Sequence, residues 1–279
     1  MRINIYGWLL SAIILTGFTF YLISVMSFQH EHEHDHEDES HTQQVALVSP
    51  VGNVALSNLP QIRLGYMLFN DPLLASDGKT SCQSCHDLNT NGAETTRFST
   101  GVNGTGTRNS PTVFNVSLNT RFFWDGRAVN LANQIDGPIH DPVEMNNTWE
   151  NITQYVADTP RYQAYFYQLY NNKITADNIK LALTSFMETL LTPDAPFDLY
   201  LQGNLSAISD TAKIGWKKFQ QLGCIVCHQG QNIGGNLFQR FGNISDEQAL
   251  ESEIDTGRFA VTGNPRDKFV FRVASLRNV

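Results

Sequence analysis

The chain has 279 residues, of which 41% are hydrophobic and 11% aromatic, enough for one large or two small packed domains. Its formal net charge is -8, but six of its 27 acids lie in one tract, residues 30–41, so 21 acids face 19 bases elsewhere. The rest of the chain is therefore close to neutral, and this balance excludes the basic surface of a nucleic-acid-binding protein.

The first predicted element is an apolar run at residues 3–28, which contains no charged residue and follows Arg2. About 20 consecutive apolar residues are long enough to cross a bilayer as a helix. The run is longer than the apolar part of an ordinary signal peptide, and no clear cleavage site follows it. We therefore predict a signal-anchor at residues 1–28 and a periplasmic or cell-envelope location at the inner membrane. A cleaved signal peptide is the alternative, and it would export the chain as well.

The next segment, residues 29–55, begins with the histidine-rich sequence HEHEHDHEDESH. Such a polar tract cannot bury enough apolar surface to pack, so we predict a disordered linker here. The tract can bind zinc or copper weakly, and a solvated tether between membrane and domain is the alternative interpretation. Five of the eight histidines lie in it, namely His30, His32, His34, His36 and His41.

From about residue 56 the apolar residues follow mainly helical spacing. Residues 87–112 are rich in Gly, Asn and Thr and predict a long irregular loop, and residues 196–206 predict a linker. Two short strands are predicted, at residues 258–262 and 268–273. The fold class is therefore predicted to be mainly α with long loops. Helices are predicted at residues 59–71, 127–135, 148–157, 160–171, 175–191 and 209–222.

All four cysteines belong to two copies of Cys-x-x-Cys-His, CQSCH at residues 82–86 and CIVCH at residues 224–228. Two cysteines three positions apart lie on one side of a helical turn. Both can bond to one haem there, and the adjacent His can bind the haem iron. This pattern is the attachment signal of c-type haem. We therefore predict two covalently bound c-type haems, held by Cys82, Cys85, His86, Cys224, Cys227 and His228.

A zinc site and a redox disulfide are the alternatives to haem for these motifs. Zinc would require the two motifs to converge on one ion, and would not require a His after each cysteine pair. A redox Cys-x-x-Cys usually lies in a βαβ unit, and no such pattern surrounds these motifs. Two haems predict two cytochrome c-like haem domains, residues 56–203 and residues 204–279, outside the cytoplasm.

Several longer stretches resemble the bacterial dihaem cytochrome c peroxidases. They also resemble related enzymes, such as the dihaem enzyme that oxidises tryptophans in maturing methylamine dehydrogenase. The resemblance covers about residues 56–279, and the tryptophan-aspartate-glycine-arginine stretch together with two haem motifs is specific. It is carried by SCQSCHDL, GTRNSPTVFN, FFWDGRAVNLANQIDGPIHDPVEM, TGRFAVTG and FVFRVASLRNV.

The resemblance implies roles for several residues of this chain. The haem at His86 is expected to react with peroxide, and the haem at His228 to pass electrons to it. Glu144 matches the family's distal acid/base, which moves a proton from one peroxide oxygen to the other. Three further residues match: Gln134, a distal amide that orients peroxide; Trp124, an electron-carrying tryptophan between the haems; and Asn109, a calcium ligand.

This sequence departs from the family's pattern in two places. Many members carry a second His on the peroxidatic haem, but Val102 stands near that position and no His occurs in residues 87–139. We therefore predict that this haem is five-coordinate or water-bound and needs no reductive activation. The sequence also stops at Val279, before the family's distal Met. We therefore expect the second haem domain to be incomplete, or its haem to lack that ligand.

Together these features predict a cytochrome c peroxidase, in which hydrogen peroxide, two electrons and two protons give two waters. The resemblance implies a small cytochrome c or a cupredoxin as electron donor, and a homodimer as the common assembly. A related alternative is an oxidase that acts on a protein or organic substrate by long-range electron transfer. The alternative outside the enzymes is a membrane-tethered dihaem electron carrier, against which Glu144 and the absent distal His argue.

Overall fold

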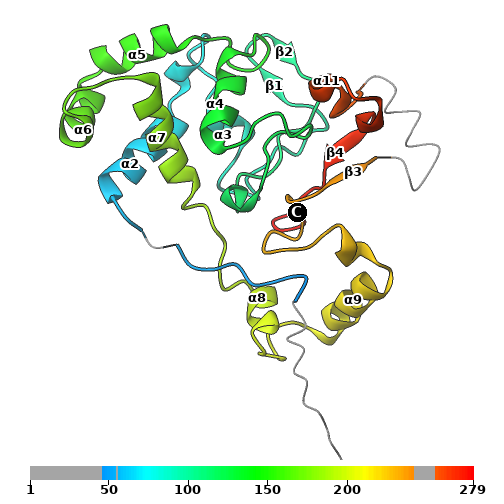
Figure 1. Ribbon diagram of the computed structural model, residues 1–279. Coiled ribbons are helices and arrows are strands. Elements are labelled where there is room, and N and C mark those ends of the chain that lie inside the picture. The colour runs from blue at the N-terminus through cyan, green and yellow to red at the C-terminus, as the bar shows by residue number, and fades with distance from the viewer. Residues whose placement is uncertain (1–45, 55, 242–254) are drawn as a thin grey trace, which may run out of the picture. The chain divides into compact units, whose positions relative to one another are not determined.

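The computed structural model (Figure 1) describes residues 46–54, 56–241 and 255–279. Within these ranges the chain from Ala46 to Val279 forms one compact unit. The predicted signal-anchor at residues 1–28 and most of the predicted linker at residues 29–55 lie outside the described residues. Among the helices that the structure describes, none is long and apolar enough to cross a membrane.

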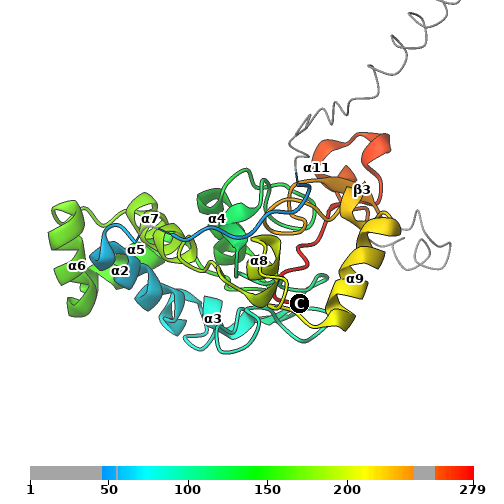
Figure 2. The ribbon, with the colours of Figure 1, turned by 90° about the horizontal axis from the view of Figure 1, so that it is seen from below.

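The main apolar core of the described chain is built by a group of helices (Figures 1 and 2). These are α2 (Leu59–Phe69), α4 (Leu131–His140), α5 (Trp149–Asp158), α6 (Pro160–Tyr170) and α7 (Ala176–Met187). Helices α2 and α7 touch through their backbones, because Gly65 lies directly against the carbonyl of Ala182. Phe122 and Met145 belong to the same core, so the segment between them is anchored at both ends.

Most predicted helices are confirmed. Helices α5, α6 and α9 (Asp210–Gln221) begin and end within one residue of the prediction. The side chains of Thr148, Thr175 and Ser209 accept hydrogen bonds from N–H groups of the first turns of α5, α7 and α9, which fixes where these helices begin. Helix α7 is shorter than predicted, because the chain turns after Met187.

The helix predicted at residues 127–135 lies further along the chain, as α4, and it includes Pro138. A proline usually ends a helix because it lacks an N–H group. Here the chain that follows α4 folds back onto its last turn: the N–H of Met145 donates to the carbonyl of Pro138 (3.2 Å), and that of Asn147 to the carbonyl of Ile139 (2.8 Å). The last turn is therefore held by the loop that follows it.

Two short antiparallel strand pairs are present in the described residues. They are β1 (Thr100–Gly101) with β2 (Gly104–Thr105), and β3 (Phe238–Arg240) with β4 (Val270–Arg272). Strand β4 confirms the prediction for residues 268–273, and the rest of the predicted loop at residues 87–112 is irregular. The strand predicted at residues 258–262 is wrong: this segment is helix α11 (Phe259–Thr262), which ends at Gly263 with a φ of 66°.

The predicted linker at residues 196–206 is partly helical. Helix α8 (Pro196–Leu201) carries the fully buried Asp198, which binds Arg277 near the end of the chain. The division into haem domains at residues 203 and 204 stays a prediction. The remaining short elements are η1 (Pro72–Leu74), α3 (Cys82–Cys85), η2 (Val116–Leu118), η3 (Cys224–Val226) and η4 (Pro265–Asp267).

Candidate functional site

The first Cys-x-x-Cys-His motif forms the short helix α3 and the residue after it. The N–H of Ser81 donates to the hydroxyl of Ser84 (3.0 Å), which fixes the start of the turn. The N–H of His86 donates to the carbonyl of Cys82 (2.9 Å), so both cysteines and the histidine lie on one helical turn. The Nδ1 atom of His86 lies 3.3 Å from the carbonyl oxygen of Gly92. This contact leaves Nε2 as the nitrogen that can bind a metal.

The second motif repeats this arrangement in η3. The N–H of His228 donates to the carbonyl of Cys224 (3.0 Å). Its Nδ1 atom lies 3.1 Å from the carbonyl oxygen of Ala274 and 3.3 Å from that of Ile233. Metal-binding histidines commonly donate their other ring N–H to a backbone carbonyl, which fixes the ring and its tautomer. Both histidines therefore have the geometry of an axial haem ligand.

The surroundings of the second motif suit a haem. The ring of Phe219 lies 6.3 Å from that of His228, and Phe219 also borders an apolar hollow of about 250 Å³. Helix α9, on one side of this hollow, buries none of its own residues. A flat apolar macrocycle fits such walls. The hollow is lined by Phe197, Ala212, Gly215, Trp216, Phe219, Ile233 and Leu276. Another hollow, of about 350 Å³ between α2 and α6, contains none of the predicted site residues.

The four cysteines form no disulfide with one another. Burial raises the pKa of Cys82 to about 12, and burial together with the nearby charges of Glu94 and Glu144 raises that of Cys85 to about 11. A redox-active Cys-x-x-Cys needs a thiol of lowered pKa, so the first pair does not have that character. Among the described residues, no group of three or more His, Cys, Asp or Glu side chains is arranged to hold a metal ion.

Glu144 lies in a loop that is held on several sides. The Oδ1 atom of Asp141 accepts the N–H of Val143 (2.8 Å), which turns the loop. The N–H of Val102 donates to the carbonyl of Glu144 (2.8 Å), so the loop pairs with the segment that follows β1. Gly101 permits this pairing, because any larger side chain there would collide with the backbone at Val143 and Glu144. The position of the Glu144 backbone is therefore well defined.

The carboxyl group of Glu144 has a raised pKa. Burial is the main cause, the neighbouring charge of Asp141 adds to it, and Arg127 opposes it. The Sγ atom of Cys85 lies 3.9 Å from the carbonyl oxygen of Thr100, in the segment that pairs with the Glu144 loop. The Glu144 loop therefore lies near the first haem motif, and the charge of Glu144 contributes to the raised pKa of Cys85. Val102, which follows β1, brings no metal-ligating side chain to the segment that pairs with Glu144. The arrangement can therefore supply a proton acceptor near the first haem motif.

Trp124 sits in a tight loop, closed where the N–H of Phe122 donates to the carbonyl of Ala128 (3.0 Å). Its indole N–H donates to the backbone carbonyl of Asn109 (2.9 Å). The Nδ2 group of Asn109 in turn donates to the carbonyls of Glu94 (3.1 Å) and Thr96 (2.7 Å). Asn109 thus joins the loop that follows the first haem motif to Trp124.

Comparison with known proteins decides what this site belongs to. The sequence model of a family described as "Di-haem cytochrome c peroxidase" matches residues 60–206, more than half of the chain. The chain belongs to this family. It is therefore an oxidoreductase of the dihaem peroxidase type, and haem is its cofactor.

Individual relatives agree with this assignment. Cytochrome c551 peroxidase of Pseudomonas aeruginosa is 41% identical over 251 residues, which is 86% of this chain and 72% of that protein. Cytochrome c551 peroxidase of Nitrosomonas europaea is 38% identical over 234 residues, which is 83% of this chain and 70% of that protein. Among solved structures, a MauG-like protein associated with microbial copper homeostasis matches with a TM-score of 0.71 at 24% identity, over 82% of this chain and 73% of that chain. The mainly helical dihaem peroxidase fold is thus confirmed.

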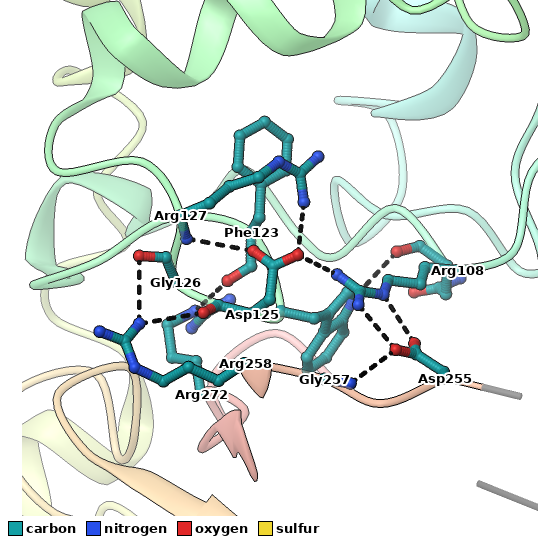
Figure 3. Close-up of polar contacts among 11 residues, drawn as sticks. Arg108, Phe123, Asp125, Gly126, Arg127, Asp255, Gly257, Arg258 and Arg272 are labelled. Atoms are coloured by element: carbon teal, nitrogen blue, oxygen red, sulfur yellow. Dashed lines mark hydrogen bonds and ion pairs between the residues drawn. The ribbon is translucent and has the colours of Figure 1, made fainter. Parts of the chain in front are cut away.

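This dihaem peroxidase has a network of arginines and aspartates around Asp125, the residue that follows Trp124 in the chain (Figure 3). Arg108 donates to Asp125 (2.6 Å) and, through two nitrogens, to Asp255 (2.7 and 2.8 Å). Arg127 also pairs with Asp125 (2.8 Å). Hydrogen bonding to Arg108 holds the pKa of Asp255 below its usual value. The network ties the loop that holds Trp124 to the chain that precedes α11.

Gln134 is the predicted site residue that the structure does not join to the others. Gln134 is half-buried in the first part of α4, and its backbone N–H donates to Asn130 (3.1 Å). The structure shows no contact between its side chain and Glu144. Sequence reasoning missed Glu94, which lies beside Cys85, and Arg272, which lies beside Trp124. The signal for Arg272 was a lone charge in the apolar strand FVFRV.

Proposed function

We propose that this chain reduces hydrogen peroxide to two waters, using two protons and two electrons from a small cytochrome c or a cupredoxin. When bound, the haem at His86 supplies an iron that can take the peroxide, and the haem at His228 supplies a redox centre for electrons from the donor. Covalent haem attachment supports a location in the periplasm or cell envelope. A membrane anchor at residues 1–28 and a homodimer belong to the same proposal.

The observation that carries this proposal is the position and pKa of Glu144. Its loop lies near Cys85, its side chain is half-buried, and its pKa is raised by burial and by Asp141. A carboxylate of raised pKa is a stronger base than one in water, so it can accept a proton from bound peroxide and return it to the leaving oxygen. Val102, at the neighbouring position, leaves this side without a protein ligand. We therefore expect the fully oxidised protein to react with peroxide without prior reduction.

Three further roles belong to the same proposal. Trp124 is linked by its indole N–H to the loop of the first motif, and Arg272 of β4 lies beside its ring, which supports a role between the two haems. Gln134 is proposed to orient peroxide from α4. Asn109 is proposed as a calcium ligand through Oδ1, since its Nδ2 already serves two backbone carbonyls.

The test is peroxide-dependent oxidation of a reduced small cytochrome c by the haem-loaded protein. Glu144→Gln keeps the shape of the side chain but cannot act as a base at neutral pH. We expect it to lower turnover by about 10² to 10⁴, the usual contribution of a positioned acid/base. Glu150→Gln is the matched control, because Glu150 lies on the surface at the start of α5. Haem content is measured for each variant.

Turnover that survives in Glu144→Gln would remove this residue from the mechanism. Protein that consumes peroxide but oxidises no small cytochrome c or cupredoxin would favour the oxidase acting on a protein or organic substrate. An oxidised spectrum that does not respond to peroxide, even after one-electron reduction, would favour the electron carrier.

A further inference from the structure

Arg272 is a buried cation at the end of β4, only 5% exposed. Its backbone N–H donates to the carbonyl of Trp124 (2.7 Å), and its Nε group to the carbonyl of Phe123 (3.3 Å). The centre of its guanidinium lies 5.6 Å from the centroid of the Trp124 ring. One nitrogen, the NH1 group, is buried and has no hydrogen-bond partner. Arg272 therefore joins β4 to the loop of Trp124, and its NH1 group still lacks a hydrogen-bond acceptor.

No carboxylate of the described residues balances this charge. Asp125, in the network of Figure 3, already binds Arg108 and Arg127, and Asp255 binds Arg108. The NH1 group of Arg258, in the same region, donates to the backbone carbonyls of Asp125 (3.1 Å) and Gly126 (3.5 Å). Burial alone lowers the pKa of Arg272 to about 10. A buried charge without a counter-ion is strongly unfavourable, so the site is incomplete without an anionic group.

The position of the free nitrogen indicates which group this is. A methyl group on Gly235 would lie 3.6 Å from NH1 of Arg272, and the N–H of Gly235 donates to the carbonyl of Val273 (2.9 Å). Two residues after Arg272, the carbonyl of Ala274 contacts Nδ1 of His228 (3.1 Å). The guanidinium thus belongs to the same wall that holds the axial histidine of the second haem. The anionic groups that a c-type haem brings are its two propionate carboxylates.

We infer that the NH1 group of Arg272 binds a propionate of the haem carried by Cys224, Cys227 and His228, and so places one fixed positive charge between that haem and Trp124. The charge favours the reduced form of that haem, because reduction removes one positive charge from the iron. It also opposes the loss of an electron from Trp124. Arg272 is thus a positioning residue: its charge favours an electron on the second haem and disfavours the oxidation of Trp124. The inference rests on the haem at His228 and not on the role of Glu144.

The experiment compares the doubly haem-loaded wild type with Arg272→Met, Arg272→Lys and Arg258→Gln. The potential of each haem is measured by spectroelectrochemical titration, and hydrogen bonding of the propionates by resonance Raman spectroscopy. In Arg272→Met we expect the one-electron equilibrium of the second haem to shift about tenfold toward the oxidised form, which is 59 mV for one electron. Its propionate band should shift as well. Arg272→Lys keeps the charge but not the planar fork, so the potential should stay within about threefold while the band moves.

Arg258→Gln is the matched control, since it removes an arginine of the same region whose NH1 group already donates to two backbone carbonyls, and we expect neither readout to move. An unchanged second-haem potential in fully loaded Arg272→Met would overturn the inference. So would a shift confined to the first haem, which would assign the guanidinium to the other propionates. If Arg272→Met does not load haem, Arg272→Lys decides, because an unmoved propionate band there would also overturn it. None of these readouts depends on peroxide turnover, so they separate this inference from the proposed function.

Discussion

At the scale of single residues, the electrostatics of Glu144 make the proposed chemistry measurable. Its pKa is set by four local influences that differ in sign. Burial and the charges of Asp141 and Glu94 favour the protonated carboxyl, and the charge of Arg127 favours the carboxylate. Since the net effect raises the pKa above the ordinary 4.5, protonation begins at a higher pH than for a carboxyl in water. The base form is therefore lost earlier as the pH falls.

This gives a prediction for the pH profile of kcat/KM for peroxide. The acid side of the profile should have its midpoint above pH 4.5, because the reaction needs the carboxylate of Glu144. Asp141→Asn should move that midpoint to lower pH, and Arg127→Gln should move it to higher pH. Asn at position 141 can still accept the N–H of Val143, so the loop is preserved. Asp158→Asn, on the exposed end of α5, is the control. Shifts of the same sign in both variants would contradict the assignment.

Much of the site could be predicted from residues alone, because local spacing determines it. Cys82, Cys85 and His86 lie on one turn whatever the rest of the fold does. The pairing of Val102 with Glu144 could not be predicted, since it joins two loops about 40 residues apart and depends on the absence of a side chain at Gly101. The free nitrogen of Arg272 is likewise a property of the packed structure. Long-range contacts between irregular segments leave no periodic signal in the sequence.

At the scale of elements, the contact between α2 and α7 supports the core beneath the first motif. Gly65 lies on the buried face of α2, next to Leu64 and Leu68, and its Cα approaches the backbone of α7 at Ala182. A side chain at this position has no room, because the neighbouring atom belongs to the backbone and not to a flexible side chain. The two helices can lie this close only with glycine there.

Gly65→Ala should therefore lower the free energy of unfolding by about 1–3 kcal/mol, the usual effect of adding a methyl group to a packed core. The better helix propensity of alanine, about 0.5–1 kcal/mol, opposes this loss only in part. The measurement is the urea unfolding of the haem-loaded protein, followed by helical circular dichroism. Gly52→Ala is the control, because an added methyl group there meets no atom within 4 Å. Equal free energies of unfolding for the two variants would show that α2 and α7 can move apart to admit a methyl group at no cost in stability.

The elements that were predicted well are those that local rules determine. Helices α5 and α9 combine an apolar stripe with a capping Thr or Ser, and their ends were found within one residue. The predictions for α4 and α11 failed for a different reason. In α4 the loop that follows the helix supports the last turn despite Pro138. In α11 the segment is too short for the strand propensity of its residues to determine the secondary structure.

At the scale of the whole described molecule, one buried ion pair joins segments that are far apart in the chain. Arg277 binds Asp198 of α8 through two nitrogens (2.6 and 3.2 Å), and both side chains are almost completely buried. The same carboxylate accepts the N–H of Val51 (3.1 Å). Arg277 also donates to the carbonyls of Ser49 (3.3 Å) and Gln231. The pair thus holds the start of the described chain, α8, the loop after the second motif and the last residues together.

Removing one partner of such a pair should be costly, because it leaves an uncompensated buried charge. Asp198→Asn keeps the shape but not the charge, and we expect it to lower the free energy of unfolding by about 3–5 kcal/mol. Asp198→Asn with Arg277→Met should lose less than the sum of the two single changes, since no unpaired charge remains. Urea unfolding of the haem-loaded variants gives the coupling energy. Asp210→Asn, which breaks the exposed pair with Lys213, is the control and should have no measurable effect. Strict additivity of the two changes at Asp198 and Arg277 would mean that the charges do not interact, and that the segments are held by their other contacts alone.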